Sequence, residues 1–220
     1  MKAVIFDFNG TLYDDTGFHV IAWRRYLREK FSIELTDAEV RARCVGPSNL
    51  QILRNCLGDG FSQTQISAFS LEKEEIYRAV ARENPENLRL VDGATELFDL
   101  LTARGIPFAL ATGSELSNVE FYLEDLGMNR WLALNRIVYY DGSIPGKPDP
   151  AIYLEAMRRL GVAPEDCVVC EDTVAGIESA RRAEAGRIVA IDTTISREEL
   201  KANPAVFAVI HDYHGFERYL

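Results

Sequence analysis

The sequence predicts an α/β fold, a Rossmann-like parallel sheet core with helices on both faces and an inserted block of α-helices. Strands that alternate with helices form parallel sheets covered on both faces, and helix-like stretches separate most of the predicted strands. The second observation is that residues 14–89 show only helical patterns, which predicts the insertion. The predicted strands are short runs of β-branched or aromatic residues at 2–6, 106–111, 136–140, 167–170, 187–192 and 206–210.

The first strand leads directly into the block without strands. Within this block, Thr36 and Glu39 have the spacing of a capping box, which indicates the start of a helix. Residues 62–82 fit either one long helix or two. An insertion of this length between two strands of one sheet is best interpreted as a separate subdomain, and its two boundaries would form a hinge.

The remaining helices follow the later strands in order. We expect helices at residues 94–103, 150–160 and 173–185, each followed by a glycine, and the second with a proline at its start. Proline at the beginning and glycine after the end is the usual asymmetry of helix termini. Ser196 and Glu199 have the spacing of a further capping box.

Composition and charge limit the possible partners. The 220 residues are 47% hydrophobic and 26% charged, which is enough to bury a core. The chain has 24 Lys and Arg against 34 Asp and Glu, a net charge of −10. Because binding to phosphate backbones and anionic membranes depends on clustered cations, neither nucleic acid nor a membrane is an expected partner. Residues 14–89 hold 11 basic and 12 acidic residues, so the acidity belongs to the sheet-forming part.

Nothing in the sequence indicates export or a membrane span, and we expect a cytoplasmic protein. The cysteines are Cys44, Cys56, Cys167 and Cys170. The last two have zinc-finger spacing, but an odd offset on a strand places their side chains on opposite faces. Since a second ligand pair is also missing, buried free cysteines are the preferred interpretation.

Residues capable of chemistry follow the expected carboxyl ends of four strands, where parallel α/β sheets bind ligands. They supply three carboxylates, one hydroxyl and one amine, from Asp7, Thr112, Lys147, Glu171 and Asp172. This set suits a divalent cation beside a phosphoryl group. Each residue alone could instead form a turn, cap a helix or lie on the surface, but their order on successive strand ends favours a site.

The order of these motifs resembles the haloacid dehalogenase superfamily, and more narrowly its β-phosphoglucomutase-like phosphatases, which carry a helical cap at the same place. The motifs are Asp7-x-x-Gly-Thr11, Thr112, Gly146-Lys-Pro-Asp-Pro150 and Glu171-Asp-Thr-x-x-Gly-Ile177. The resemblance covers nearly the whole chain. It implies a core domain formed by residues 1–13 and 90–220 and a helical cap subdomain formed by residues 14–89.

The resemblance also implies a phosphatase mechanism. Asp7 would be the nucleophile that forms an aspartyl-phosphate. Mg²⁺ would be held by Asp7, the backbone carbonyl of Asn9 and Asp172, with Glu171 as a further ligand or as a neighbour of the ligands. The implied substrate is a small phosphorylated metabolite, and protein partners are left undefined.

Phosphate-binding roles follow from the same resemblance. Thr112 and the backbone amide of Gly113 would hold the phosphoryl oxygens, and Lys147 would bridge the nucleophile and the phosphate. In the cap, His19 and Trp23 match the subgroup, which uses this histidine near the hinge. Their spacing of four also suits packing on one helical face, so substrate binding and packing both remain open.

Asn9 departs from the family pattern, because phosphatases usually carry there a second aspartate that protonates the leaving group. An amide cannot transfer a proton, and general acid–base catalysis is typically worth about 10² to 10⁴ in rate. Substrates with poor leaving groups should suffer most. The chain could be a natural phosphatase that uses His19 or a substrate group, a deliberately altered enzyme, or a weakly active phospholigand binder. Deamidation at Asn9-Gly10 could also restore the carboxylate.

The cap departs as well. Mutases of the subgroup grip a second phosphate with an arginine, whereas this segment reads Gly46-Pro47-Ser48-Asn49, and Glu115 replaces a common lysine. Both changes remove positive charge meant for a distal phosphate, so we expect a monophosphate substrate, with Gly46 at its binding site. A metal-independent dehalogenase is the alternative from another class. Tyr13 fits it, but Glu171 and Asp172 supply metal carboxylates that such enzymes lack.

Overall fold

The computed structural model describes all residues from 1 to 220, and the chain forms two compact units. Residues 1–14 and 89–220 form the first, here called the sheet unit, and residues 15–88 form the second, the helical unit. No helix in either unit has the length and apolar character needed to cross a membrane.

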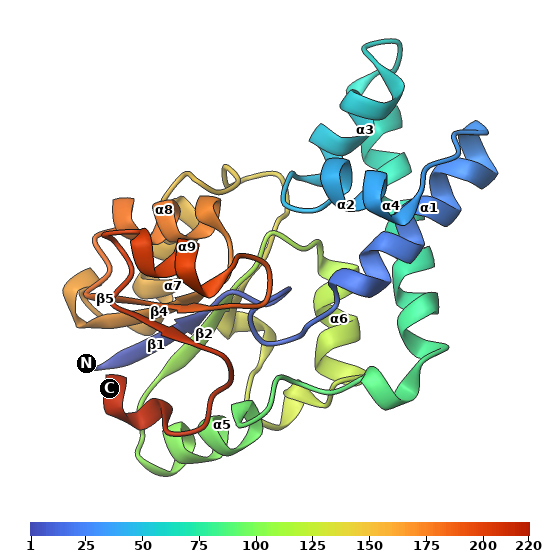
Figure 1. Cartoon of the computed structure of the whole chain (residues 1–220). Coiled ribbons are helices and arrows are strands. Elements are labelled where there is room, and N and C mark those ends of the chain that lie inside the picture. Colours follow the sequence, from blue (N-terminus) through green and yellow to red (C-terminus); the bar gives the residue numbers. More distant parts are fainter. The chain divides into compact units, whose positions relative to one another are not determined.

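The sheet unit is built on six parallel strands in the order β3-β2-β1-β4-β5-β6 (Figure 1). Central β1 pairs with β2 on one side and with β4 on the other, so that Val4 lies between Phe108 and Val168. The predicted fold class is confirmed, and each predicted strand is present. The strands are β1 (Ala3–Phe6), β2 (Phe108–Ala111), β3 (Ile137–Val138), β4 (Cys167–Glu171), β5 (Arg187–Ile191) and β6 (Ala208–Ile210).

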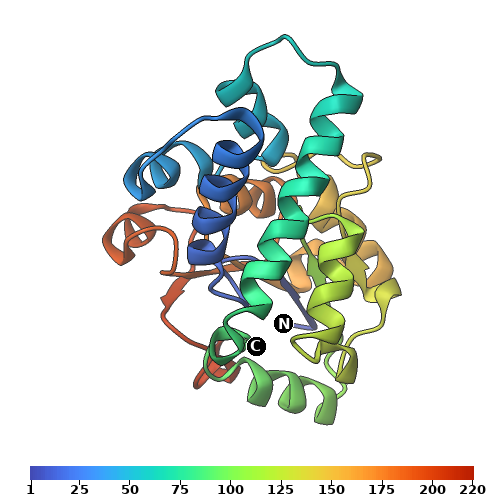
Figure 2. The same ribbon diagram turned by 90° about the vertical axis from the view of Figure 1, so that its right-hand side faces the viewer.

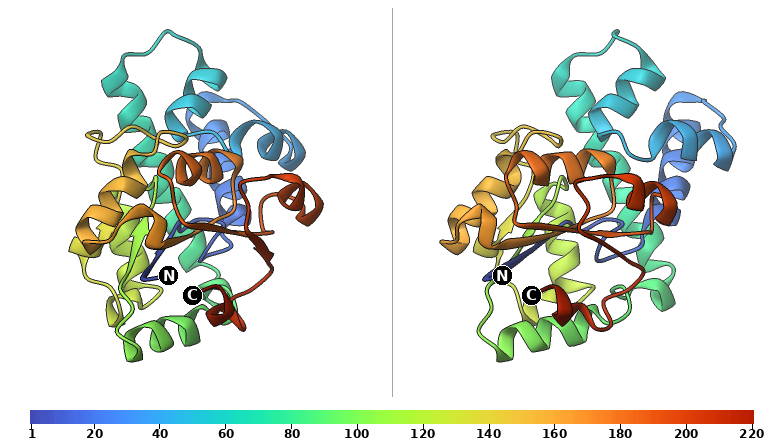
Figure 3. Two further views of the ribbon diagram at one scale, coloured as in Figure 1. Left: turned by 90° about the vertical axis from the view of Figure 1, so that its left-hand side faces the viewer. Right: turned by 60° about the vertical axis from the view of Figure 1, so that its left-hand side comes forward.

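Helices cover both faces of this sheet, and Figure 3 shows α8 and α5 on opposite sides of the strands. One face packs on α7, α8 and α9 through a cluster that includes Ile5, Val169 and Met157. On the other face, Phe6 contacts Phe98 of α5 at 5.4 Å between ring centroids. The helices are α5 (Ala94–Ala103), α6 (Leu116–Glu124), α7 (Ala151–Leu160), α8 (Val174–Arg182) and α9 (Arg197–Ala202), with 3₁₀ turns at Met128–Arg130, Leu134–Arg136, Pro164–Asp166 and Phe216–Tyr219.

Most residues predicted to begin or end helices in the sheet unit do so in the structure. Gly161 ends α7 in the left-handed conformation at φ 68°, where its N–H bonds the carbonyl of Met157. Helix α8 ends three residues earlier than predicted, at Arg182. Ser196 caps α9 by accepting the N–H of Glu199 at 3.3 Å, which is one half of the predicted capping box.

The four cysteines are free thiols. Cys167 belongs to the cluster under α7 and α8, as an inward-pointing residue of that face. Cys170, three residues further along β4, is also fully buried, and its thiol interacts with Tyr213. Burial raises the pKa of both thiols, which makes them poor nucleophiles and poor metal ligands.

The helical unit contains α1 (Thr16–Phe31), α2 (Asp37–Cys44), α3 (Asn49–Leu57), α4 (Gln63–Arg82) and a 3₁₀ turn at Pro85–Asn87. The segment that fitted one helix or two is the single helix α4, which lies beside α1 (Figure 2). Capping boxes begin α2 at Thr36 and α4 at Ser62. The unit has its own apolar interior, which includes Trp23, Leu27 and Ile52.

Candidate active site

The predicted site residues of the sheet unit lie beyond the carboxyl ends of neighbouring strands. Asp7 follows β1, Thr112 follows β2, and Glu171 and Asp172 lie at the end of β4. Lys147 is on the loop between β3 and α7. Because β2, β1 and β4 are adjacent in the sheet, residues distant in sequence emerge side by side at one edge.

Three carboxylates form the centre of this site. One oxygen each from Asp7, Glu171 and Asp172 lies within 4.8 Å of the others. These residues are 8%, 0% and 1% exposed. Carboxylates buried so completely are costly unless a cation or hydrogen-bond donors compensate their charge.

Lys147 supplies part of that compensation. Its Nζ is 2.5 Å from Oδ1 of Asp7 and 2.6 Å from Oε1 of Glu171. Burial opposes the charge on this amine, but the two carboxylates outweigh burial and raise the pKa of Lys147. One ammonium group faces three carboxylates, so the cluster retains an excess of negative charge.

The excess charge appears in the titration of the aspartates. Burial, reinforced by Glu171 and opposed by Lys147, raises the pKa of Asp7 to about 7. Burial together with Glu171 and Asp7 raises the pKa of Asp172 well above its usual range. For Glu171, the contact with Lys147 outweighs burial and lowers the pKa. The raised pKa values mean that these carboxyl groups bind protons easily. A bound metal cation would neutralise the same negative charge.

Hydroxyl groups fix the orientation of the two carboxylates on β4. The hydroxyl of Tyr153 on α7 donates to Glu171 at 2.7 Å. Asp172 accepts from the hydroxyl of Thr11 at 2.9 Å and from that of Thr194. Thr11 is the last residue of the first motif but has no predicted role, and the sequence patterns do not single out Tyr153 or Thr194. Thr194 follows β5, so the strand-end rule that identified the others could have found it.

Two glycines of the motifs are required by close approaches to these carboxylates. At Gly10, with φ at +75°, a Cβ atom would lie 2.1 Å from Oδ2 of Asp172. At Gly176, a Cβ atom would lie 1.7 Å from Oε1 of Glu171. The spacing of both glycines in their motifs therefore has a steric cause.

The predicted phosphate-binding segment follows β2. Thr112 is 1% exposed and its hydroxyl accepts the N–H of Ser114 at 3.1 Å. Gly113, between them, is exposed. Asn9 is also near this segment, since Oγ of Ser114 donates to Oδ1 of Asn9 at 2.8 Å. The structure thus joins the segment after β2 to the loop that carries Asp7.

The remaining predicted residues, His19, Trp23 and Gly46, belong to the helical unit. Nδ1 of His19 lies 2.7 Å from Nζ of Lys73, and its ring stacks on Tyr77 at 4.1 Å. Trp23 is 1% exposed and packs in the apolar interior. Gly46 is exposed, with φ at +101°.

Lys73 was not selected from the sequence, although it is fully buried in the helical unit. Its Nζ forms an ion pair with Oε1 of Glu74 at 2.7 Å and lies 5.0 Å from the ring of Trp23. On a helix rich in charged residues, nothing in the local pattern of α4 marks this lysine as the one that is buried.

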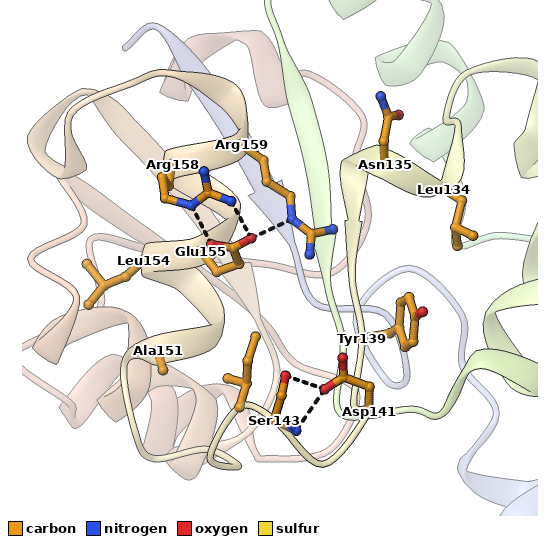
Figure 4. Close-up of a pocket in the computed structure, with 11 residues that line it drawn as sticks. Leu134, Asn135, Tyr139, Asp141, Ser143, Ala151, Leu154, Glu155, Arg158 and Arg159 are labelled. Carbon is orange, nitrogen blue, oxygen red and sulfur yellow. Dashed lines mark hydrogen bonds and ion pairs between the residues drawn. The ribbon is translucent and has the colours of Figure 1, made fainter.

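A separate groove lies along α7 and the segment around β3 (Figure 4). It encloses about 840 Å³, and none of the predicted site residues lines it. Its two arginines, Arg158 and Arg159, are both paired with Glu155. Asp141 also lines the groove, so the two arginines face two carboxylates and the groove offers no net positive charge to a phosphate.

Comparison with known proteins identifies the family of the chain. The family model described as "haloacid dehalogenase-like hydrolase" matches residues 1–184. The chain belongs to this family. Its expected character as a phosphatase of this family is confirmed, as is the narrower resemblance to the β-phosphoglucomutase-like phosphatases.

Three similar proteins illustrate the relationship. A "phosphorylated carbohydrates phosphatase" of Thermotoga maritima is 31% identical over 196 residues, which span 87% of this chain and 85% of that protein. A "beta-phosphoglucomutase" of Bacillus subtilis is 31% identical over 192 residues, or 83% and 80%. The crystal structure of a family IA, variant 3 hydrolase of the haloacid dehalogenase type from Entamoeba histolytica has a TM-score of 0.91. It is 33% identical and covers 97% of this chain and 94% of that one.

Proposed function

We propose that this enzyme is a Mg²⁺-dependent phosphatase that hydrolyses small phosphorylated sugars through an aspartyl-phosphate on Asp7. The observation that carries the proposal is the position of Lys147, whose Nζ bridges Asp7 and Glu171 inside a cluster of three buried carboxylates. A nucleophilic carboxylate, an ammonium group beside it and a cluster of oxygen ligands are the parts that phosphoryl transfer requires.

The ligand set of the cluster fits Mg²⁺. All its candidate ligands are oxygens, from Asp7, Asp172, Glu171 and the backbone carbonyl of Asn9, and oxygens are the ligands that Mg²⁺ prefers. Burial and the uncompensated negative charge together raise the pKa of Asp7 and Asp172, and this charge supports the same assignment. When bound, the ion would neutralise charge on the phosphoryl group and polarise it for attack.

The protein residues account for the rest of the mechanism. Deprotonated Asp7 attacks phosphorus, the bond to the leaving oxygen breaks as the aspartyl-phosphate forms, and the leaving oxygen takes its proton from solvent water. Thr112 and the amide of Gly113 bind phosphoryl oxygens, while the Lys147 ammonium stabilises the charge that develops on them. Water then attacks the phosphorus of the aspartyl-phosphate, Asp7 leaves as a carboxylate, and the proton lost by the water passes to the phosphate or to solvent. Asn9 can orient groups by hydrogen bonds, but it cannot deliver the proton that a poor leaving group needs.

The substrate class is proposed from the relatives and from charge. The Thermotoga maritima relative is named for phosphorylated carbohydrates. Residues 14–89 carry nearly balanced charge, which suits a substrate with one phosphate and a neutral remainder. We assign to this unit the role of a cap subdomain, with His19 and Gly46 as its proposed contributions to substrate binding. Trp23 instead packs in the apolar interior of the unit, where it is 1% exposed.

A second candidate function is the binding of a phosphorylated ligand with little turnover. Asn9 favours it, because the amide is held by Tyr122 and Ser114, neither of which is an acid at neutral pH. In that case beryllium fluoride, a phosphoryl mimic, would bind at Asp7 while no phosphate ester is hydrolysed.

A panel of sugar phosphates, acetyl phosphate and haloacids tests the proposal, with Mg²⁺ and with a chelator. We expect phosphate release that requires Mg²⁺ and is abolished in Asp7→Asn. Activity on haloacids that survives the chelator would instead support carbon–halogen chemistry. Binding of beryllium fluoride without release of phosphate from any ester would support the phospholigand binder.

A further inference from the structure

A closed ring of hydrogen bonds holds the side chain of Asn9. Its Nδ2 donates to the hydroxyl of Tyr122 at 2.9 Å, and its Oδ1 accepts from Oγ of Ser114 at 2.8 Å. The hydroxyl oxygens of Tyr122 and Ser114 are themselves 2.9 Å apart. We call these three residues the Asn9 ring.

The donors and acceptors of the Asn9 ring match an amide. One arrangement lets each group donate one hydrogen and accept one, from Asn9 to Tyr122, from Tyr122 to Ser114 and back to Asn9. The Tyr122 hydroxyl also lies 3.2 Å from Oδ1 of Asn9 and can donate to it directly. The ring also closes if the amide is turned over, with every bond running in the opposite direction. An ionised carboxylate at position 9 could accept from both hydroxyls, but it has no hydrogen to donate and would lose the bond from position 9 to Tyr122.

Packing fixes the position of the tyrosine in this ring. Tyr122 lies on α6, is fully buried, and stacks on Phe8 with ring centroids 3.8 Å apart and 22° between the planes. Phe8 is the residue between Asp7 and Asn9. The aromatic contact and the hydrogen bond therefore attach α6 to two consecutive residues of the loop that carries the nucleophile.

We propose that Tyr122 and Ser114 are positioning residues of the reaction, which hold the side-chain amide of Asn9 in a fixed orientation. They hold the Asn9 amide two residues from Asp7, and an amide fixed by several bonds need not reorganise when charge develops nearby. This inference rests on the proposed phosphatase function. In this proposal Asn9 has a role in the site, because Tyr122 and Ser114 supply hydrogen-bond partners for its side-chain oxygen and nitrogen.

Kinetics of combined variants test the role in the reaction. Tyr122→Phe and Ser114→Ala are each prepared with Asn9 and with Asn9→Ala, and assayed with Mg²⁺ and the best substrate of the panel. With Asn9 present, we expect kcat to fall by about 3- to 10-fold, the rate equivalent of one hydrogen bond, with KM unchanged. In Asn9→Ala the same changes should have no further effect. Equal losses in both backgrounds would mean that Tyr122 is only structural and would overturn the proposal.

A spectroscopic readout separates this inference from the proposed function. The side-chain NH₂ signals of Asn9, identified by their loss in Asn9→Ala, should shift in Tyr122→Phe and in Ser114→Ala. They should not shift in Tyr139→Phe, a control tyrosine in the same unit that lines the groove of Figure 4. Unmoved signals in Tyr122→Phe would overturn the ring even in an active phosphatase. Shifted signals in a protein without turnover would contradict the phosphatase function and not the ring.

Discussion

The hydroxyl of Tyr153 donates a hydrogen bond to Glu171 at 2.7 Å, while its ring lies 5.0 Å from Nζ of Lys147. One buried side chain of α7 therefore contacts both members of an ion pair on two other segments. Residues that support metal ligands in this way orient them and tune their affinity, although they need not touch the ion.

Removing this hydroxyl should weaken the proposed metal site. We expect Tyr153→Phe to lower the affinity for Mg²⁺ by about 10- to 100-fold and the free energy of unfolding by about 1 to 3 kcal/mol, because a buried carboxylate loses a partner. Calorimetric titration with Mg²⁺ and urea unfolding measure the two effects. Tyr139→Phe is the control. Unchanged Mg²⁺ affinity in a folded Tyr153→Phe protein would mean that Glu171 is held without the tyrosine.

How much of this site the sequence could reveal depends on the kind of signal. The strands were found because β-branched runs and turn residues act locally, and Asp7, Lys147 and Asp172 were found because they follow strand ends in a recognisable order. Tyr153 does not follow a strand end. It lies three residues after Pro150, in a segment where it resembles any buried residue of a helix. Its role follows only from the packing of α7 on the sheet.

Buried partners from different segments were missed for the same reason. Lys73 pairs with Glu74 inside the helical unit, and Tyr122 reaches Asn9 across 113 positions of sequence. Such pairs depend on tertiary contacts, which residue spacing does not encode. The pattern over residues 62–82 fits one helix or two, and only the packing of α4 beside α1 shows that it is a single helix.

The contact between Gly176 and Glu171 should make this glycine intolerant of a side chain. The added Cβ of Gly176→Ala would overlap Oε1 of Glu171, so either α8 or the carboxylate must move. We expect a loss of about 1 to 3 kcal/mol in the free energy of unfolding. Gly17→Ala, in α1, is the matched control, because its Cβ would meet no atom within 4 Å and alanine favours helix. Equal stability of the two variants in urea would contradict the steric argument.

Binding of Mg²⁺ should depend on pH around neutrality. The pKa of Asp7 is raised from 3.8 to about 7, so the folded metal-free protein binds a proton that the unfolded chain has lost over that range. Its stability contribution is therefore present at low pH and is lost as pH rises toward 7.

Because Mg²⁺ needs the ionised carboxylate, its binding displaces this proton. We expect the Kd for Mg²⁺ to rise by at least about tenfold for each pH unit below 7, because Asp172, whose pKa is also raised, adds a second proton to be displaced. Calorimetry in buffers with different ionisation enthalpies measures both the affinity and the protons released. Asp7→Asn should release fewer protons. An affinity that stays constant from about pH 8 to about pH 5.5 would show that the carboxylates are already ionised without metal.

Asn9→Asp should change turnover according to the leaving group. The new carboxyl group can protonate a sugar oxygen, a step typically worth about 10² to 10⁴ in rate. Acetyl phosphate has a good leaving group and needs little such help, so its turnover should change far less. The gain on sugar phosphates is expected to be smaller than this range, because the hydroxyls of Tyr122 and Ser114 are arranged around an amide. Equal gains on both substrates would mean that position 9 is not where the missing acid acts. As a control, peptide mass analysis of the unaltered protein shows whether residue 9 is still an amide, and therefore whether deamidation at Asn9-Gly10 contributes to the measured activity.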